Sequence, residues 1–372
     1  MESIEEPKLN RLFKTTLKTP LISKKTTSRT VKDLEYLSIA SKQLEHTQCT
    51  TLPKPSTVSD YCENNCISRP YNSSLIINTQ EFNEVVEKLR SFFVARKFLE
   101  VSTQNRLSIL AACEDPFNVG TFNYAGNCWT LPQTGQMWLE YELLKNPEPE
   151  GYFCLTTSYR MEKNPVENRH DLIFPLFEFE MKGGMDALME LEKDLLIHLG
   201  YNSEMFIEEK YENIAKLYGV TELEHEHEQN LYDQITPTFF IKDFPEFTSP
   251  FWNMRRNTEN DTARKVDVIL SGQETIGSAE RETDKEVMRE RFNTIMEGGY
   301  KNKIYELFGK ERTENEMDDY LNFEFFERCG GGIGMTRLIR SMKLEGLLST
   351  SQSSTSKLSN NIEQNVEVEQ RI

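Results

Sequence analysis

Two spacings of apolar residues alternate through the middle of this 372-residue chain. In segments 82–97, 186–199 and 336–348 apolar side chains recur every three or four positions, which predicts amphipathic helices. Shorter apolar or alternating runs predict strands at 98–101, 129–131, 152–161, 172–181, 238–241, 266–270 and 323–327. Strands joined by turns, with helices packed outside them, make an α+β domain around an antiparallel sheet.

The most informative pair of strands flanks a polar turn that contains a proline, in the segment TSYRMEKNPVENRHDLIFPLFEFEM at 157–181. Alternation on both sides of the turn predicts a β-hairpin that directs charged side chains from one face. Arg160, Glu162, Arg169 and His170 are expected to gather at one mouth. A polyphosphate suits this set, because a guanidinium presents a rigid fork of donors to phosphoryl oxygens.

A second segment, CGGGIGMTRLIRSM at 329–342, places a run of glycines before a helical pattern. Gly330, Gly332 and Gly334 would let a nucleotide approach the backbone closely, since a Cβ would occupy the space. The helix that follows carries Arg337. Taken alone, such a glycine run does not distinguish one kind of nucleotide site from another.

Together the two segments resemble motifs 2 and 3 of the class II aminoacyl-tRNA synthetases, most closely the asparaginyl and aspartyl group. The first matches R-x-E, R-H-x-x-x-F and two later acids, here Arg160, Glu162, Arg169, His170, Phe174, Glu178 and Glu180. The second matches G-x-G-x-G-x-x-R, here Gly330, Gly332, Gly334 and Arg337. Further similar segments follow the family's order within 77–348, at 82–103, 130–140, 226–246 and 265–282.

The resemblance implies the class II synthetase fold, an antiparallel β-sheet flanked by helices, with a site for ATP. Arg160 would hold the α-phosphate and the reacting carboxylate, and Arg169 or His170 would meet the γ-phosphate. Phe174 and Arg337 resemble the pair that encloses adenine. Arg160 and Arg337 are therefore the expected catalytic residues. The other expected ATP-binding residues are Glu162, Gly330, Gly332 and Gly334.

The same resemblance implies residues for a metal ion and for an amino acid. Asp267 and Glu274 match the acids that meet Mg²⁺ and ATP, and Mg²⁺ commonly takes one or two carboxylates together with phosphate oxygens. Arg281 matches an arginine that pairs with the amino-acid side chain, while Gln136 and Glu114 would hold the α-amino and α-carboxyl groups. The expected substrate is aspartate or asparagine.

Each of these residues also has a simpler interpretation. Charged strand faces are usually just solvated, and Phe174, which lies among Ile173, Leu176 and Phe177, would fit a core position. The EHEH run at 224–227 could suggest zinc ligands, but two histidines at i and i+2 do not share a helix face, so solvated charge is expected there. The functional interpretation of these residues is favoured because they occupy the expected positions within the matched motifs.

Composition and charge narrow the range of partners. A formal net charge of −17 argues against a broadly basic surface for nucleic acid, but it leaves room for local basic patches and so for tRNA. Seven cysteines, an odd number, indicate reduced thiols inside a cell, and Cys62 and Cys66 lack the second pair that a metal site needs. With no bilayer-spanning run and no signal-peptide core, a cytoplasmic protein with no membrane partner is expected.

The predicted organisation is one catalytic domain, 77–348, between two low-complexity ends. Residues 1–70 and 349–372 are polar with little apolar periodicity and are expected to be disordered. The first of these segments does not predict the anticodon-binding barrel that synthetases of the Asp, Asn and Lys type carry. Two positions depart from the family pattern: Ile173 replaces a Glu of motif 2, and Gln104 replaces a Pro of motif 1.

Three functions remain open on the sequence. The first is a synthetase that activates aspartate or asparagine and passes it to tRNA. The second is an asparagine synthetase, in which ammonia takes the place of tRNA. The third is an inactive regulatory protein with the same fold, against which the retention of Arg160, Asp267 and Arg281 speaks, because packing requires none of these charges. Since motif 1 forms the subunit contact in this family, the resemblance also implies a homodimer.

Overall fold

The computed structural model describes residues 77–103, 107–109, 114–162, 165, 169–248 and 250–349. These residues belong to one compact unit that begins at Ile77. The predicted extension at 1–70 and, apart from Ser349, the predicted tail lie outside the described residues. The disorder of both ends therefore stays a prediction.

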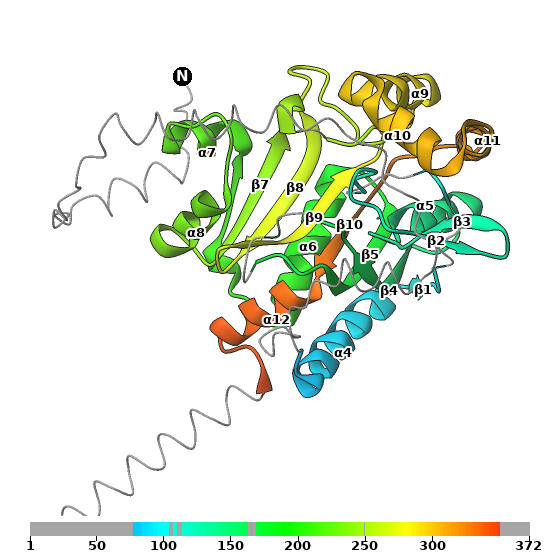
Figure 1. The fold of residues 1–372 in the computed structure, drawn as a ribbon. Coiled ribbons are helices and arrows are strands. Elements are labelled where there is room, and N and C mark those ends of the chain that lie inside the picture. The colour runs from blue at the N-terminus through cyan, green and yellow to red at the C-terminus, as the bar shows by residue number, and fades with distance from the viewer. Residues whose placement is uncertain are drawn as a thin grey trace, which may run out of the picture. The chain divides into compact units, whose positions relative to one another are not determined.

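An eight-stranded mixed sheet forms the centre of this unit (Figure 1). In spatial order its strands are β1 (Phe98–Glu100), β4 (Gly151–Tyr159), β5 (Ile173–Lys182), β10 (Arg328–Gly334), β9 (Gln273–Glu280), β8 (Ala263–Leu270), β7 (Thr238–Phe244) and β6 (Phe206–Lys210). Neighbours from β4 to β7 are antiparallel, whereas β1 and β6 join the two edges as parallel strands. The predicted α+β architecture is confirmed, with parallel pairing added at the edges.

One face of the sheet is covered by three helices, α4 (Thr79–Ala95), α6 (Met185–Leu199) and α12 (Met335–Leu344), of which α4 and α12 lie side by side (Figure 1). Phe177 and Phe179 of β5 are fully buried against them. Burying one such ring stabilises the fold by roughly 2 kcal/mol. Because alternate strand residues point to opposite faces, this burial directs the residues between and beside them to the other face.

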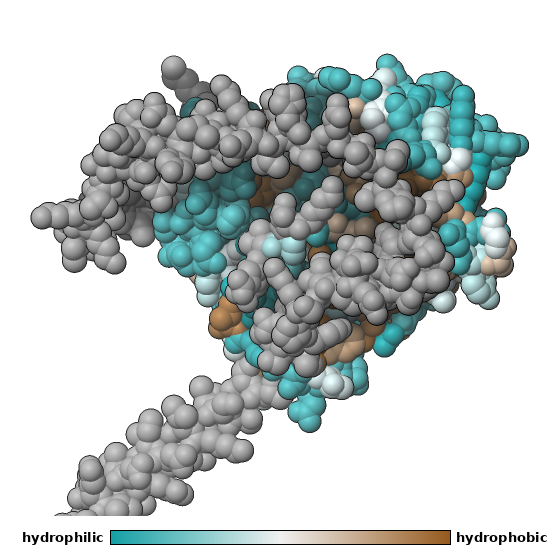
Figure 2. Space-filling model, in the orientation of Figure 1, coloured by the Kyte–Doolittle hydropathy of each residue, from teal (hydrophilic) through white to brown (hydrophobic). Residues whose placement is uncertain are grey.

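The second face carries α5 (Gln136–Lys145), which packs on β4, and a group of three helices that encloses a second core around Trp252. These helices are α9 (Lys285–Thr294), α10 (Gly299–Phe308) and α11 (Lys310–Leu321). The smaller elements include β2 (Thr121–Tyr124), β3 (Asn127–Thr130), α7 (Tyr211–Tyr218) and α8 (His225–Gln234). Figure 2 shows a mostly hydrophilic surface over α9 to α11, in keeping with the net charge of −17.

The prediction of a strand at 323–327 is wrong. These residues are irregular, and the strand begins at Arg328 and runs through the glycines to Gly334. The three phenylalanines of 323–327 pack against the second core instead. The strand β10 is paired on both sides, with β5 and with β9. A central strand needs only its backbone groups to pair, and glycine allows that without contributing an apolar pattern.

The three predicted helices are confirmed, with differences at their ends. The last one stops at Leu344 instead of 348, just before Gly346, whose φ of 68° lies in the left-handed region. Among the described residues, none of the helices combines the length and the apolar character that a passage through a bilayer requires.

Candidate active site

A cavity of about 320 Å³ opens on the face of the sheet that α4, α6 and α12 leave uncovered. Strands β5, β8, β9 and β10, the turn between β4 and β5, and the starts of α5 and α12 supply its walls. It brings together the predicted residues Gln136, Arg160, Glu162, Arg169, His170, Phe174, Glu274, Arg281, Gly330, Gly332, Gly334 and Arg337. Asp267 and Glu114 are not among the residues that line it.

Strand register explains why these residues share one face. Residues directly opposite each other in an antiparallel pair point to the same side of the sheet. Gly332 of β10 lies opposite Glu178 of β5 and Gly277 of β9, and Gly330 lies opposite Ala279. Two adjacent strands therefore present only hydrogen or methyl groups at these positions, which makes the floor of the cavity nearly flat.

The floor glycines are required for different reasons. A Cβ at Gly330 would lie 1.9 Å from Oε2 of Glu180, so the protein itself excludes any larger residue at this position. A Cβ at Gly332 would meet nothing nearer than Leu176 at 3.6 Å, and one at Gly334 nothing nearer than 3.7 Å. Packing does not demand glycine at 332 or 334, so the space above these two positions is available to a ligand.

Arg160 and Arg337 bring guanidinium groups from distant parts of the chain to this floor. The guanidinium carbon of Arg160, just beyond β4, lies 5.3 Å from the ring centroid of Phe174. Within the described part of the chain Arg160 makes no ion pair, and its buried Nε has no hydrogen-bond partner. Arg337, in the first turn of α12, donates from Nη1 to the backbone oxygen of Glu274 at 2.6 Å. Arg160 thus keeps a positive charge that no neighbouring carboxylate directly matches.

The outer rim of the cavity is held by two paired side chains of the hairpin. Arg169 forms an ion pair with Glu228 of α8, and Nδ1 of His170 lies 2.8 Å from Oε2 of Glu162. Glu228 also accepts a hydrogen bond from the backbone nitrogen of Glu274 at 2.8 Å. Burial raises the pKa of Glu228, and the nearby Glu274 adds to the shift. This carboxylate therefore ties the hairpin to β9.

Sequence reasoning missed Glu228, and its interpretation of the EHEH run as solvated charge is wrong for one residue. His227 is 8% exposed, and its Nδ1 accepts a hydrogen bond from the backbone nitrogen of Glu224 at 2.8 Å, which caps α8. The cap fixes where the helix starts and hence where Glu228 points. The signal available in the sequence was the capping spacing itself, with a polar side chain three residues after an acidic one.

Two carboxylates, from Asp267 of β8 and Glu274 of β9, flank Gly277, at which a Cβ would lie 3.6 and 3.0 Å from their oxygens. Burial raises the pKa of Asp267 to about 7, against the effect of Lys265. Burial acts in the same direction on Glu274, but Lys265 and Arg337 hold the pKa of Glu274 below its ordinary value. The Nζ of Lys265 lies 2.7 Å from Oδ2 of Asp267, while the buried Oδ1 has no hydrogen-bond partner among the described residues.

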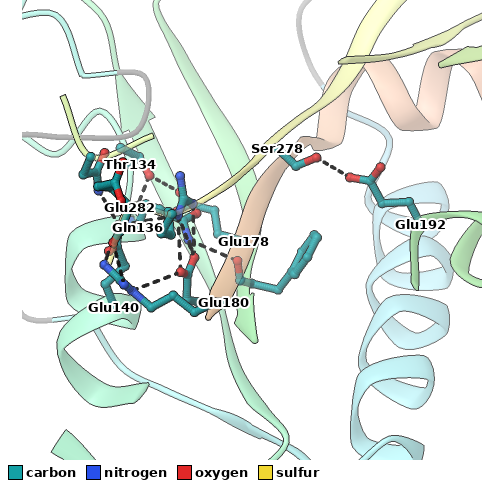
Figure 3. A network of polar contacts seen from close by, with 12 residues as sticks. Thr134, Gln136, Glu140, Glu178, Glu180, Glu192, Ser278 and Glu282 are labelled. Carbon is teal, nitrogen blue, oxygen red and sulfur yellow. Dashed lines mark hydrogen bonds and ion pairs between the residues drawn. The ribbon is translucent and has the colours of Figure 1, made fainter. Parts of the chain in front are cut away.

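The end of the cavity near α5, here called the inner end, is a buried polar network (Figure 3). Oε2 of Glu180 accepts hydrogen bonds from Nε2 of Gln136 at 2.5 Å and from Nη2 of Arg281 at 3.1 Å. Nε of Arg281 lies 3.6 Å from Oε1 of Glu140. Glu178, also at this end, accepts from the backbone nitrogen of Gly135 at 2.7 Å and from Thr134 and Thr156. The inner end therefore offers both donors and acceptors in a dry environment.

Glu114 does not join Gln136 and Arg281 at the inner end. It is buried, with 6% of its surface exposed, and its charge acts on Tyr300 in the second core. Lys265 is the opposite case, because it lines the cavity although the sequence assigned it no role.

Comparison with known families identifies the class of protein. The model of the family described as tRNA synthetases class II (D, K and N) matches residues 65–346, well over half of the chain. The chain therefore belongs to this family of class II aminoacyl-tRNA synthetases, which are ATP-dependent ligases. No curated protein sequence matches the chain.

Solved structures share the fold at low sequence identity. Asparaginyl-tRNA synthetase from Pyrococcus horikoshii, complexed with asparaginyl-adenylate, is 18% identical, with a TM-score of 0.57 over 70% of this chain and 64% of that one. The Entamoeba histolytica asparaginyl-tRNA synthetase in complex with asparaginyl-adenylate is 16% identical, with a TM-score of 0.59 over 71% of this chain and 63% of that one. The aspartyl enzyme of Entamoeba histolytica is 15% identical, with a TM-score of 0.54 over 86% and 67% of the two chains. The chain thus spans less than two thirds of the length of the first two.

Proposed function

We propose that this chain activates aspartate or asparagine with ATP to form an aminoacyl-adenylate, and that tRNA is the acceptor. The observation that carries the proposal is the cavity that Arg160 and Arg337 both line, over a floor of glycines. The asparaginyl-adenylate in two of the similar structures supports the same class of ligand for this cavity. Pyrophosphate is the expected second product.

The glycine floor of the cavity and the charged side chains around it suit a nucleotide. Phe174 and Arg337 would enclose the adenine, and a cation–π contact of this kind contributes about 1 to 2 kcal/mol once water is excluded. Gly332 and Gly334 leave the space that the sugar and the phosphates would fill. Arg169 or His170, both side chains of the rim, would then meet the γ-phosphate.

Arg160 has the properties that the chemical step requires. The reaction is an in-line displacement at the α-phosphorus, in which a carboxylate oxygen attacks and pyrophosphate leaves, so two anions must be brought together. A fixed cation that is already oriented lowers the cost of this approach, and loss of one such donor typically costs about 3 kcal/mol in the transition state. Arg160 suits the role because it makes no ion pair within the described part of the chain.

The charge balance at the outer end of the cavity, which includes the rim with Arg169 and His170, supports a requirement for Mg²⁺. Its four cationic side chains face five acidic ones, namely Arg160, Arg169, Lys265 and Arg337 against Glu162, Asp171, Glu228, Asp267 and Glu274. A triphosphate adds further negative charge, which these groups do not offset. Asp267 and Glu274 would hold the ion, and the Oδ1 of Asp267 fits that role because no described residue forms a hydrogen bond with it. When bound, Mg²⁺ supplies positive charge to the phosphate oxygens.

Two carboxylates are too few to enclose a metal without help. No cluster of three or more His, Cys, Asp or Glu side chains suited to a metal occurs among the residues that the structure describes. Phosphate oxygens and water would complete the coordination, as is common for Mg²⁺. Metal and nucleotide are therefore expected to bind together.

A homodimer in the cytoplasm is the proposed form of the protein. The segment 82–103, which resembles motif 1, comprises most of α4 and the strand β1. Two large apolar side chains of this segment are unusually open, since Val94 is 60% and Leu99 50% exposed. A second subunit that covers them would remove apolar surface from water, which favours association.

The test is exchange of labelled pyrophosphate into ATP. The purified chain is incubated with ATP, Mg²⁺ and aspartate, asparagine or lysine separately, with EDTA as the control for the metal. Exchange with aspartate or asparagine is expected, followed by transfer to tRNA. Amide formation with ammonia and without RNA would assign the chain to asparagine synthesis instead. Absence of exchange with every amino acid, together with no uptake of MgATP in calorimetry, would overturn the proposal.

A further inference from the structure

Lys265 of β8 lines the cavity, although neither the sequence pattern nor the family resemblance assigned it a role. Its side chain is 21% exposed, and Nζ lies 2.7 Å from Oδ2 of Asp267. The ring of Phe244, on the neighbouring strand β7, lies against the same ammonium, with 4.1 Å between Nζ and the ring centroid. A carboxylate and an aromatic ring therefore fix the position of this charge before a ligand arrives.

Strand register directs Lys265 to the face of the sheet that carries the glycine floor. Lys265 lies opposite Ala279 of β9, and Ala279 lies opposite Gly330 of β10. Two positions further along β8, and hence on the same face, Asp267 lies opposite Gly277. At these two positions β9 contributes only a methyl group and a hydrogen atom. The ammonium of Lys265 therefore faces the floor on which the proposal places the nucleotide.

The roles already proposed for the cationic side chains leave one phosphate unmatched. Arg160 is assigned to the α-phosphate, Arg169 or His170 to the γ-phosphate, and Arg337 to the adenine. The β-phosphate lies between the α- and γ-phosphates and has no cationic side chain assigned to it. Lys265 carries a positive charge at the same end of the cavity, beside one of the acids proposed to hold Mg²⁺.

We propose that Lys265 is a further residue of the adenylation site, whose ammonium binds the β-phosphate of ATP and stabilises the pyrophosphate that leaves. The inference rests on the proposed function and adds to it a residue to which the family resemblance gives no role. As the carboxylate oxygen of the amino acid forms its bond to the α-phosphorus, the bond to the bridging oxygen breaks. The bridging oxygen keeps the electron pair and leaves with the pyrophosphate. A fixed ammonium beside that group offsets the negative charge that develops on it.

The alternative is that Lys265 serves only as the counter-charge of Asp267. A double variant, Lys265→Met with Asp267→Asn, separates the two roles because it removes both charges of the pair and leaves the net charge of the cavity unchanged. Replacing a largely buried ion pair by neutral side chains of similar size is often close to neutral for stability. If Lys265 is only a counter-charge, the double variant should bind pyrophosphate as the native chain does. If Lys265 contacts phosphate, binding should stay weak.

The experiment is calorimetry of the full chain with inorganic pyrophosphate, in EDTA and at low ionic strength, so that a metal ion does not contribute. We expect the Kd to rise at least about tenfold in Lys265→Met and in the double variant, as is typical for the loss of one hydrogen bond to a charged group. Lys265→Arg keeps the charge and should retain most of the affinity. AMP, which lacks the β- and γ-phosphates, should bind the native chain and Lys265→Met alike.

Lys242→Met is the matched control. Lys242 belongs to β7, the strand next to β8, and its Nζ lies 3.3 Å from Oε2 of Glu208. It is not among the residues that line the cavity, and Phe240, two positions before it, lies in the core on the opposite face of the sheet. This replacement should leave the Kd for pyrophosphate unchanged. Circular dichroism and thermal unfolding of each variant show whether it is folded.

The outcomes separate this inference from the proposed function. Weaker binding of pyrophosphate in Lys265→Met and in the double variant, with unchanged binding of AMP, supports the inference. Native affinity in the double variant overturns it, and so does a native chain that takes up no pyrophosphate; the proposed adenylation still stands if the native chain exchanges pyrophosphate with aspartate or asparagine. If the double variant does not fold, Lys265→Gln with Asp267→Asn, which keeps a hydrogen bond between the two side chains, takes its place. A native chain that neither binds pyrophosphate nor exchanges it with any amino acid removes both proposals.

Discussion

Replacing Gly332 by alanine tests whether position 332 must be glycine because the fold requires it or because a bound ligand requires it. The added Cβ would have its nearest neighbours at 3.6 and 3.7 Å, in Leu176 and Glu178, which is ordinary van der Waals contact, and φ of Gly332 does not lie in the left-handed region. An alanine that fits without strain often stabilises a protein by about 0.4 to 1 kcal/mol, through the unfolded chain. The free energy of unfolding should therefore stay the same or rise slightly.

The effect on nucleotide binding should have the opposite sign. The methyl group would project from the centre of the floor, in the cavity of about 320 Å³ where the proposal places the nucleotide. Extra volume in a tightly packed site typically costs about 1 to 3 kcal/mol. Since 1.4 kcal/mol is a factor of ten, the Kd for MgATP should rise by roughly tenfold to a hundredfold.

Two measurements test this reasoning, urea unfolding for stability and calorimetry with MgATP for binding. Gly299→Ala is the control for a glycine that has room but lies outside the cavity: a Cβ there meets nothing nearer than 3.8 Å, and its φ is −60°. It should leave the Kd unchanged. Gly330→Ala, with a Cβ 1.9 Å from Glu180, should lower stability instead. Unaltered MgATP binding in a folded Gly332→Ala protein would refute a nucleotide on this floor.

Two further predictions concern charges. Arg160→Ala should reduce kcat for pyrophosphate exchange by a factor on the order of a hundred, from about 3 kcal/mol of lost stabilisation, while circular dichroism stays native; near-normal turnover would remove its assigned role. Glu192→Gln should be nearly neutral at pH 5 and stabilising at pH 9. Burial raises the pKa of Glu192 from 4.5 to about 8, so the folded protein binds this proton more tightly and native stability falls as pH rises through that range. The gain at pH 9 should amount to a few kcal/mol, since one pKa unit corresponds to about 1.4 kcal/mol. If urea unfolding gave the same difference in free energy of unfolding between the native protein and Glu192→Gln at pH 5 and at pH 9, this prediction would be contradicted.

The parts of the site that the sequence predicted are those specified by local patterns. The motif of the hairpin grouped Arg160, Arg169 and His170, and all three line one cavity from the turn between β4 and β5. The parts that were missed depend on contacts between distant segments. Glu228 reaches Arg169 from α8, and the position of Lys265 at the cavity follows from sheet order, which no local pattern encodes.

The strand predictions failed for a related reason. A strand after the turn that follows 266–270 was expected at Glu274 without bounds, and it is β9, with the sequence QETIGSAE, whereas β10 was placed several residues too early. Both strands present the floor of the cavity on one face, so alternate positions carry small or polar residues where a buried strand would have apolar ones. The hydrophobic signal is therefore weakest where the candidate site is built, whereas the helices and the core residues Phe177 and Phe179 were evident from it.

The double pairing of β10 limits what the middle of the cavity can recognise. Gly330 and Gly332 lie in register with β5 on one side and with β9 on the other, so the ladder on both sides engages their backbone amides and carbonyls. A flat group that lies there contacts a smooth surface. Such a surface can exclude groups of the wrong thickness or shape, but it offers no hydrogen-bond donors or acceptors that could distinguish one base from another. Discrimination between one purine and another must then come from groups around the perimeter, and variants of the rim should alter base preference while variants of the floor alter affinity for all nucleotides alike.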